Sequence, residues 1–409
     1  MIRVLHTADW HLGKRLQEYS RIAEQREVLN EIVELADAKE VDLVLIAGDI
    51  FDTFNPSHEA VELFFKTLKR LSRGGDRPVV VISGNHDSTQ FIEAPDPLAR
   101  EMGILFYGKY DSLIPTGEIG NGIQVCRSEQ GFVELQLPKM TFPIRVILAP
   151  YANELLLKAY LGEEDREAEL RKLLARRWQD LADAYCDQQG VNLFMGHFFF
   201  VKEGKEPDPE PESERPILHV GGTQAIFTHD LPSSLQYAAL GHLHRYHSVQ
   251  ERPFPVTYSS SPLAYSFSEA EQDKQGVIID AAPSQPVKIT PLALTKGKPL
   301  YRRTFDNLPG ALDWLEANQD AYVELTYVTE NAIDASTRKT LQNAHDGIVN
   351  LIPQLKNPHG QTLAGLQVAD LEKDMKTLFA MYYEASRGIP PNEETLSIFT
   401  EIISQTEHP

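Results

Sequence analysis

The sequence predicts a layered α/β fold built on buried strands that end in polar residues. Three apolar runs end in this way: VDLVLIAGDIFD at 41–52, PVVVISGNHD at 78–87 and LQYAALGHLH at 235–244. These runs are too apolar for a solvated face, which indicates strands buried on both sides. Helical patterns at 16–39 and 58–73 separate the first strands, and this β-α-β-α-β order is typical of helices packed on a sheet.

The rest of the first 283 residues extends this pattern. A strand at 2–5 precedes the first helix, and strands at 143–150 and 191–198 flank helical segments at 152–188. Short strands at 255–262 and 276–281 indicate a second sheet packed on the first. A glycine precedes the polar residue at most strand ends, where it permits a sharp turn and a close approach by another group.

The character of the chain changes near Ala282, and we divide it into three parts: 1–283, 284–355 and 356–409. The second part alternates strands and helices and is expected to be a small α+β domain. The third opens with the turn residues KNPHGQ, followed by amphipathic helices at 366–386 and 392–405. Their apolar stripes predict a helical hairpin that docks on a partner protein, and the alternative is that the two helices pack only on each other.

Composition excludes several classes of protein. The 409 residues are 42% hydrophobic and 24% charged, which excludes wholesale disorder, and no run is long enough to span a membrane. The net charge of −20 excludes a free-standing DNA binder that relies on its own Lys and Arg. Two cysteines without metal or disulfide spacing, Cys126 and Cys186, indicate a reducing cytoplasm. The acidic, proline-rich stretch at 202–216 is expected to be a mobile loop, and its role stays open.

Eight of the thirteen histidines stand in ordinary contexts, but five lie at or just beyond an apolar strand. Together with two aspartates and an asparagine they offer imidazole nitrogen and oxygen but no thiolate, a donor set that suits Mn²⁺, Fe²⁺ or Zn²⁺. Seven ligands are too many for one ion and fit two ions that share a carboxylate. The strand-end residues are Asp9, His11, Asp49, Asn85, His86, His197, His242 and His244.

The ordered motifs DWH, GDIFD, GNHD, GH and GHLH resemble the calcineurin-like metallophosphoesterase superfamily. Within it, HTADWHLG, GDIFD, GNHDS and GHLHR resemble the SbcD family of nuclease subunits. The resemblance implies a four-layer β-sandwich flanked by helices, with two metal ions at the strand ends. One departure is that the Gly-Ser-Pro usual after the last histidines reads Ser260-Ser261-Pro262 here.

The resemblance also implies a role for each site residue. One ion takes Asp9, His11 and His244, the other takes Asn85, His197 and His242, and Asp49 bridges them. His86 corresponds to the catalytic histidine, and Asp52 to the residue that orients it. An alternative for Asp52 is a simple turn or cap aspartate. Lys14 and Arg15 are expected on the rim where DNA approaches, although ordinary surface charge would explain them as well.

Three functions compete at this stage. The favoured one is an Mn²⁺-dependent DNA nuclease that cuts duplex ends and hairpin or single-stranded DNA in repair and recombination. The resemblance implies that it acts with an SbcC-type ATPase bound through 366–405, and it leaves open whether two copies pair as a homodimer. The second is a stand-alone phosphoesterase of a small nucleotide or phospholipid precursor, and the third is a scaffold without catalysis, which the complete ligand set disfavours.

Overall fold

The computed structural model describes residues 1–152, 166–205, 212, 226–330, 333–356, 377–380, 383, 391, 395–396 and 399. Contacts divide the chain into two compact units. The first comprises Met1–Arg302 with Asp320–Glu324, and the second comprises Arg303–Gln319 with Leu325–Pro409. Among the described residues, no helix combines the length and the apolar character needed to cross a membrane.

The first unit contains a six-stranded sheet whose centre is parallel. Every residue of its strands β4 and β5 is buried, as expected for strands covered on both faces. Strands β1, β4, β5 and β6 run parallel. On the other side of β1, β17 pairs antiparallel with β1, and β18 pairs antiparallel with β17. In sheet order the strands are β18 (Lys288–Leu294), β17 (Lys274–Ala281), β1 (Ile2–Thr7), β4 (Leu43–Ala47), β5 (Val79–Ile82) and β6 (Ile104–Tyr107).

An eight-stranded sheet packs against the first. Its strands β10, β11, β14 and β16 are parallel, and antiparallel strands flank them. Side chains from the two sheets, such as Leu45 and Leu193, share one core cluster. In order the strands are β15 (Tyr246–Gln250), β16 (Val256–Ser259), β14 (Tyr237–Gly241), β11 (Val191–His197), β10 (Ile144–Ala149), β9 (Phe132–Gln136), β8 (Ile123–Glu129) and β7 (Gly117–Ile119).

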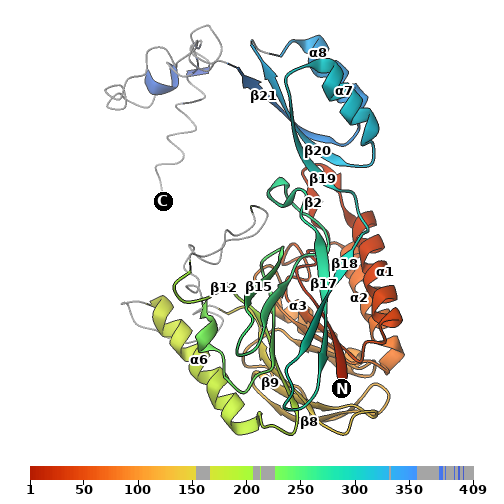
Figure 1. Ribbon diagram of the computed structural model, residues 1–409, viewed down its shortest axis with the longest axis vertical. Coiled ribbons are helices and arrows are strands. Elements are labelled where there is room, and N and C mark those ends of the chain that lie inside the picture. The colour runs from red at the N-terminus through yellow and green to blue at the C-terminus, as the bar shows by residue number, and fades with distance from the viewer. Residues whose placement is uncertain are drawn as a thin grey trace. The chain divides into compact units, whose positions relative to one another are not determined.

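Helices cover the outer face of each sheet, which gives four layers (Figure 1). Helices α1 and α2 pack through residues such as Leu29 and Phe64 on β4 and β5, and α6 packs through Leu174 and Trp178 on the second sheet. The Ser57 side chain caps α2 by accepting from the Ala60 N–H at 3.3 Å. The predicted β-sandwich flanked by helices is confirmed. The helices are α1 (Ile22–Ala38), α2 (His58–Leu71), α3 (Thr89–Glu93), α4 (Asp96–Arg100) and α6 (Arg166–Tyr185), with 3₁₀ turns η1 (Arg73–Gly75), η2 (Thr228–Asp230) and η3 (Phe267–Glu269).

The first helix is shorter than the sequence pattern suggested. We predicted a helix over 16–39, but α1 begins at Ile22, and the preceding residues form a small hairpin of β2 (Arg15–Leu16) and β3 (Tyr19–Ser20). Gln17 takes a φ of 51° in the connecting turn, a left-handed conformation that no α-helix contains. Another short pair, β12 (Phe200–Val201) and β13 (Ile226–Phe227), flanks the acidic insert, of which only 202–205 and Glu212 lie within the described residues.

The boundary that the sequence pattern placed at 284 falls inside a sheet. Strand β18 pairs with β17 along its whole length and so continues the first sheet, and the division between units comes at Arg302. Strands β19 (Leu300–Phe305), β20 (Tyr322–Thr329) and β21 (Ile348–Leu355) form a three-stranded sheet. Helices α7 (Leu308–Ala317) and α8 (Ala335–Ala344) accompany it, capped by Asn307 and Asp334.

The helices expected at 366–386 and 392–405 fall largely outside the described residues, and the same is true of 153–165 within the segment 152–188, where α6 accounts for the remainder.

Candidate metal centre

Strand ends from both sheets deliver the predicted site residues to one edge of the sandwich. Strands β1, β4 and β5 of the first sheet run parallel, and so do β11 and β14 of the second. The site residues follow the last residue of each strand or form it. All seven predicted ligands gather there, and all except the partly buried Asn85 are fully buried: Asp9, His11, Asp49, His197, His242 and His244.

Glycines allow the strand ends to approach one another. A Cβ atom on Gly48, whose φ is 87°, would lie 2.4 Å from Nδ1 of His197. A Cβ on Gly84 would lie 2.1 Å from Oδ1 of Asp49, and one on Gly241 would lie 2.0 Å from the Ala47 carbonyl oxygen. Any larger residue at these positions would therefore displace a neighbouring strand end, which confirms the close approach inferred from the glycines in the motifs.

Two pairs of facing atoms define two halves of the site. In one half, Nε2 of His11 lies 3.0 Å from Nε2 of His244. In the other, Nε2 of His197 lies 2.9 Å from Oδ1 of Asn85. Nδ1 of His197 donates to the Ala47 carbonyl oxygen at 2.8 Å, which directs the Nε2 atom into the site.

Asp49 lies between the two halves. Its Oδ2 atom is 3.6 Å from Nε2 of His11 and 3.3 Å from Nε2 of His197. Its Oδ1 atom accepts from the His86 backbone N–H at 2.9 Å, which fixes the plane of the carboxylate. A single carboxylate oxygen therefore faces ligand atoms of both halves.

The electrostatics of the site favour cations. Oδ2 of Asp9 is buried and has no hydrogen-bond partner within the described part of the chain. Burial is the main reason that the pKa of Asp9 rises to about 7. Burial lowers the pKa of His197, but the carboxylates of Asp49 and Asp9 outweigh it and raise that pKa to about 10. The two carboxylates that would hold this proton on His197 can instead be neutralised by a divalent ion. The residues of the site therefore fit metal ions.

The backbone at the site is strained. Asp9, His11 and Asp49 have φ values of 56°, 42° and 50°, and His242 has 103°. Each such conformation costs a non-glycine residue about 1 kcal/mol or more, and it persists only where the surroundings enforce it. Hydrogen bonds supply that enforcement, because Oδ1 of Asp9 accepts from the His242 N–H at 2.8 Å and the Asp9 N–H donates to the Gly48 carbonyl at 3.0 Å.

His86 and Asp52 contact each other, although not through the Asp52 carboxylate. Nδ1 of His86 lies 2.9 Å from the backbone carbonyl oxygen of Asp52, whereas the Asp52 carboxylate accepts from Nζ of Lys14 at 2.6 Å. The rings of His86 and His11 are perpendicular, with centroids 4.8 Å apart. His86 also lies close enough to His11 and Asp49 to complete a three-residue metal cluster, a geometry that the sequence pattern did not indicate.

Two buried acids at the site were not identified from the sequence. The Asp87 carboxylate accepts from the backbone N–H groups of Gly84, Ile50 and Phe51 at 2.9–3.1 Å, which ties the loops after β4 and β5 together. Asp87 is the last residue of the motif GNHD, so this motif could have identified it from the sequence. Glu269 contacts His244, but it stands 25 residues further along the chain in a polar stretch that carries no motif.

The structure accommodates the departure at Ser260. This residue takes a φ of 79°, which favours glycine, and its hydroxyl exchanges hydrogen bonds with the backbone of Gln275 at 2.9 and 3.0 Å. These bonds offset part of the cost of the left-handed conformation.

The chain is similar to several known proteins. The calcineurin-like phosphoesterase family matches residues 2–246. The chain is 32% identical over 413 residues to the SbcD protein of the nuclease SbcCD of Bacillus subtilis, an alignment that covers 99% of each chain. It is 35% identical over 284 residues to the corresponding protein of Rhodobacter capsulatus, covering 69% of this chain and 67% of that one. Among solved structures, a dimetal phosphatase from Danio rerio gives a TM-score of 0.44 at 12% identity, covering 72% of this chain and 96% of that one.

Proposed function

The chain belongs to the calcineurin-like phosphoesterases and, among them, to the SbcD nuclease subunits, and we propose that it cuts DNA with two Mn²⁺ ions. As a member of this family it is a metal-dependent phosphodiesterase of the nuclease type. The proposed cleavage is exonucleolytic at duplex ends and endonucleolytic at hairpins or single strands, in DNA repair and recombination.

The position of Asp49 carries the proposal. An oxygen that lies 3.6 Å from His11 and 3.3 Å from His197 suits a bridge between two ions. We assign one ion to Asp9, His11 and His244 and the other to Asn85, His197 and His242. The close pairs His11–His244 and Asn85–His197 support this division, because the two ligand atoms of each pair lie close enough together to bind the same ion. Oxygen and imidazole donors without thiolate suit Mn²⁺, Fe²⁺ or Zn²⁺, and of these we propose Mn²⁺.

A pair of bound divalent ions would polarise the phosphodiester and lower the pKa of a bound water. The protein's own groups then act around the scissile bond. His86 is suited to protonate the leaving oxygen as a general acid. The Asp52 carbonyl can only accept, so Nδ1 of His86 holds its proton there, and the proton delivered to the substrate comes from Nε2. Asp52 thus orients His86 through its peptide oxygen, and its carboxylate positions Lys14.

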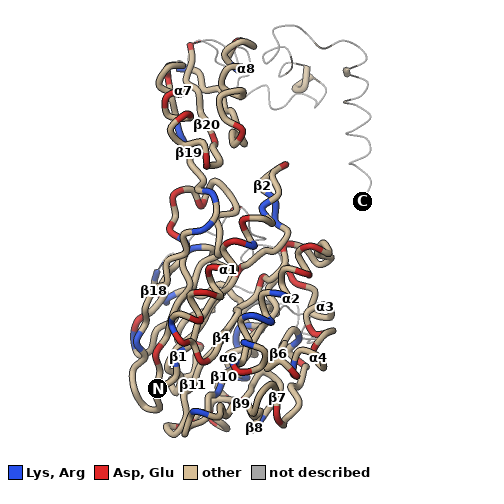
Figure 2. The backbone as a smooth tube through the Cα atoms, turned by 90° about the vertical axis from the view of Figure 1, so that its right-hand side faces the viewer, with Lys and Arg blue, Asp and Glu red and all other residues tan. Residues whose placement is uncertain are grey.

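The second candidate is a stand-alone phosphoesterase of a small nucleotide or phospholipid precursor. The net charge of −20 favours it, and acidic residues predominate along α1, whereas α2 carries both acidic and basic residues (Figure 2). However, a small substrate gives no reason for the residues beyond β18. A match that extends over 99% of a nuclease component also favours DNA.

A protein partner would reconcile the acidic chain with DNA. The relatives are named as one subunit of SbcCD, and we propose that this chain likewise binds an SbcC-type ATPase through residues 366–405. A basic surface of that ATPase would then contact DNA. We further propose a cytoplasmic location, since Cys126 and Cys186 are free thiols and DNA is the substrate.

Cleavage of an end-labelled hairpin DNA, assayed beside bis(p-nitrophenyl) phosphate, tests the proposal. We expect Mn²⁺ to restore both activities to chelator-treated protein, and the ATPase to increase only DNA cleavage. Hydrolysis of the small phosphodiester without any cleavage of hairpin or duplex DNA, with and without the ATPase, would support the second candidate.

A further inference from the structure

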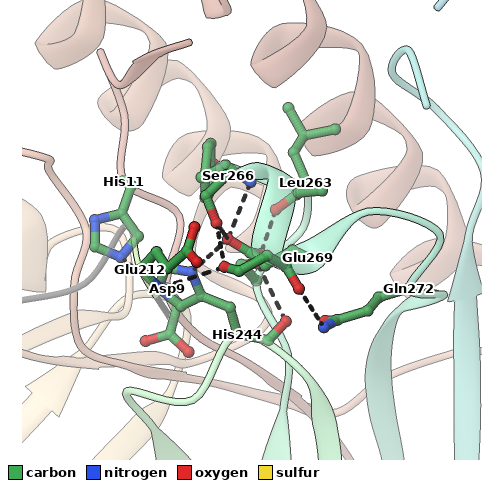
Figure 3. Close-up of polar contacts among 12 residues, drawn as sticks. Asp9, His11, Glu212, His244, Leu263, Ser266, Glu269 and Gln272 are labelled. Atoms are coloured by element: carbon green, nitrogen blue, oxygen red, sulfur yellow. Dashed lines mark hydrogen bonds and ion pairs between the residues drawn. The ribbon is translucent and has the colours of Figure 1, made fainter. Parts of the chain in front are cut away.

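Glu269 contacts the ring nitrogen of His244 that faces away from the metal centre. Its Oε1 atom lies 3.2 Å from Nδ1 of His244, and Glu269 lies beside His244 and Ser266 (Figure 3). Glu269 is only 2% exposed, and it lies at the end of the 3₁₀ turn η3. The contact therefore joins a proposed ligand to a segment that contributes no ligand itself.

Further hydrogen bonds hold Glu269 in place. Oε1 also accepts from the Tyr265 N–H at 3.2 Å and from the Ser266 hydroxyl at 3.3 Å. Oε2 accepts from Nζ of Lys274 at 2.6 Å and from the Ser261 hydroxyl at 3.4 Å. A buried carboxylate with this many donors has a fixed orientation, and the Lys274 ammonium compensates its charge.

Lys274 holds His244 from a second direction. Nζ of Lys274 donates to the backbone carbonyl oxygen of His244 at 2.6 Å as well as to Glu269. The ring and the main chain of His244 are therefore both tied to one buried ion pair. Lys274 belongs to β17, so the first sheet anchors this pair.

We propose that Glu269 is a positioning residue for metal binding, which accepts the Nδ1 proton of His244 and so aims the lone pair of Nε2 into the site. A carboxylate oxygen accepts this hydrogen bond, which selects the Nδ1–H tautomer and leaves Nε2 as the ligand atom facing His11 at 3.0 Å. The inference rests on the proposed role of His244 as a ligand. It predicts that loss of Glu269 lowers the affinity for one ion and leaves the affinity for the other unchanged.

Three variants separate the parts of this role. Glu269→Gln keeps an acceptor oxygen beside His244 and removes the charge. Glu269→Leu combined with Lys274→Met removes the acceptor without leaving a buried charge. Glu269→Asp retains the charge beside Lys274 but withdraws the carboxylate from His244 by one methylene group. Glu34→Gln, on the exposed face of α1, is the matched control.

The readout is calorimetric titration of metal-free protein with Mn²⁺, with the melting temperature of the metal-free protein measured in parallel. We expect the double variant to bind one ion about 10- to 100-fold more weakly and the other with unchanged affinity, and Glu269→Asp to show the same pattern less strongly. Glu269→Gln should recover most of the affinity, a rescue that a merely structural role would not predict.

Wild-type affinity for both ions in the double variant would overturn the inference. If the double variant fails to fold, wild-type affinity in Glu269→Asp would overturn it instead. Wild-type protein that binds fewer than two ions would overturn the metal site itself, and this outcome is distinct from failure of the Glu269 role alone.

Discussion

Nδ1 of His6 in β1 accepts a hydrogen bond from the Tyr237 hydroxyl in β14 at 3.0 Å, and this contact joins the two sheets behind the metal centre. Nε2 of His6 lies 3.1 Å from the Leu240 carbonyl oxygen, which can only accept, so this nitrogen carries the proton. Both side chains are fully buried. The bond helps to align β1, which leads to Asp9, with β14, which leads to His242.

Because of His6, the free energy of unfolding should decrease as the pH is lowered. Burial lowers its pKa from 6.5 to about 3. Below pH 6.5 the unfolded chain takes up a proton that the folded chain refuses until about pH 3, so this contribution is complete above pH 6.5 and decreases as the pH falls. The expected loss is about 2 kcal/mol between pH 7 and pH 5. Urea unfolding at both pH values should show a smaller loss in His6→Asn than in wild type.

The exposed His229 provides the control, because its ring is about half accessible and His229→Asn should retain the wild-type pH dependence. An equal pH dependence in wild type and His6→Asn would show that His6 is protonated in the folded protein.

Replacing His86 by alanine should abolish turnover without emptying the site. Its proposed role is proton transfer, so we expect hydrolysis to fall by a factor of about 10² to 10⁴ while two ions remain bound. Metal content by mass spectrometry measures this, with His11→Ala as the variant that should lose an ion. If His86→Ala also lost an ion, His86 would be a ligand beside His11 and Asp49, an arrangement that their spacing permits.

Replacing Asp49 by alanine should remove at least one ion, because its Oδ2 atom faces both halves of the site. We expect no more than one bound ion per chain after dialysis against trace Mn²⁺, together with loss of phosphodiester hydrolysis. Asp183→Ala, on the exposed side of α6, should retain both ions. Two tightly bound ions in Asp49→Ala would contradict the bridge.

DNA binding is better tested with Arg15 than with Lys14. Lys14 pairs with the Asp52 carboxylate, so changing it would disturb the surroundings of His86. Arg15 is exposed, and among the described residues its side chain donates to the backbone carbonyls of Gln17 and Glu18 in its own hairpin. We expect Arg15→Glu to weaken duplex binding and to lower the slope of log affinity against log salt by about 1. Hydrolysis of a small phosphodiester should be unchanged, and an equal loss on both substrates would indicate damage to the metal centre.

The proposed ATPase contact predicts that a chain ending at Lys356 no longer co-purifies with the cognate ATPase. A chain that ended at Pro353 would lack the last residues of β21. A chain that ends at Lys356 keeps the whole strand, and its last N–H still donates to the Thr329 carbonyl oxygen at 2.9 Å. Because this truncation leaves the described metal centre intact, hydrolysis of the small phosphodiester should remain. Stoichiometric co-purification of the truncated chain would contradict docking through 366–405, and the same chromatography reports whether two copies of the chain form a homodimer.

The sequence by itself determined which of the proposed metal ligands assemble at the metal centre. Asp49, Asn85 and His197 each mark the end of a strand whose apolar run is visible in the sequence, and parallel strands bring such ends to one edge. The local pattern therefore carried long-range information. The same logic did not determine the start of α1, because the turn at Gln17 interrupts a stretch whose composition also suits a helix.

Only the tertiary structure decided how the neighbours of these ligands are connected. The family resemblance implied that Asp52 orients His86. In the folded chain the Asp52 carbonyl makes that contact, and its carboxylate pairs with Lys14, 38 residues away. The pairing of Glu269 with His244, and of both with Lys274, likewise has no periodic signature. Hydrogen bonds between side chains depend on atomic direction after packing, whereas strand ends depend on hydrophobic pattern, and only the pattern is written locally in the sequence.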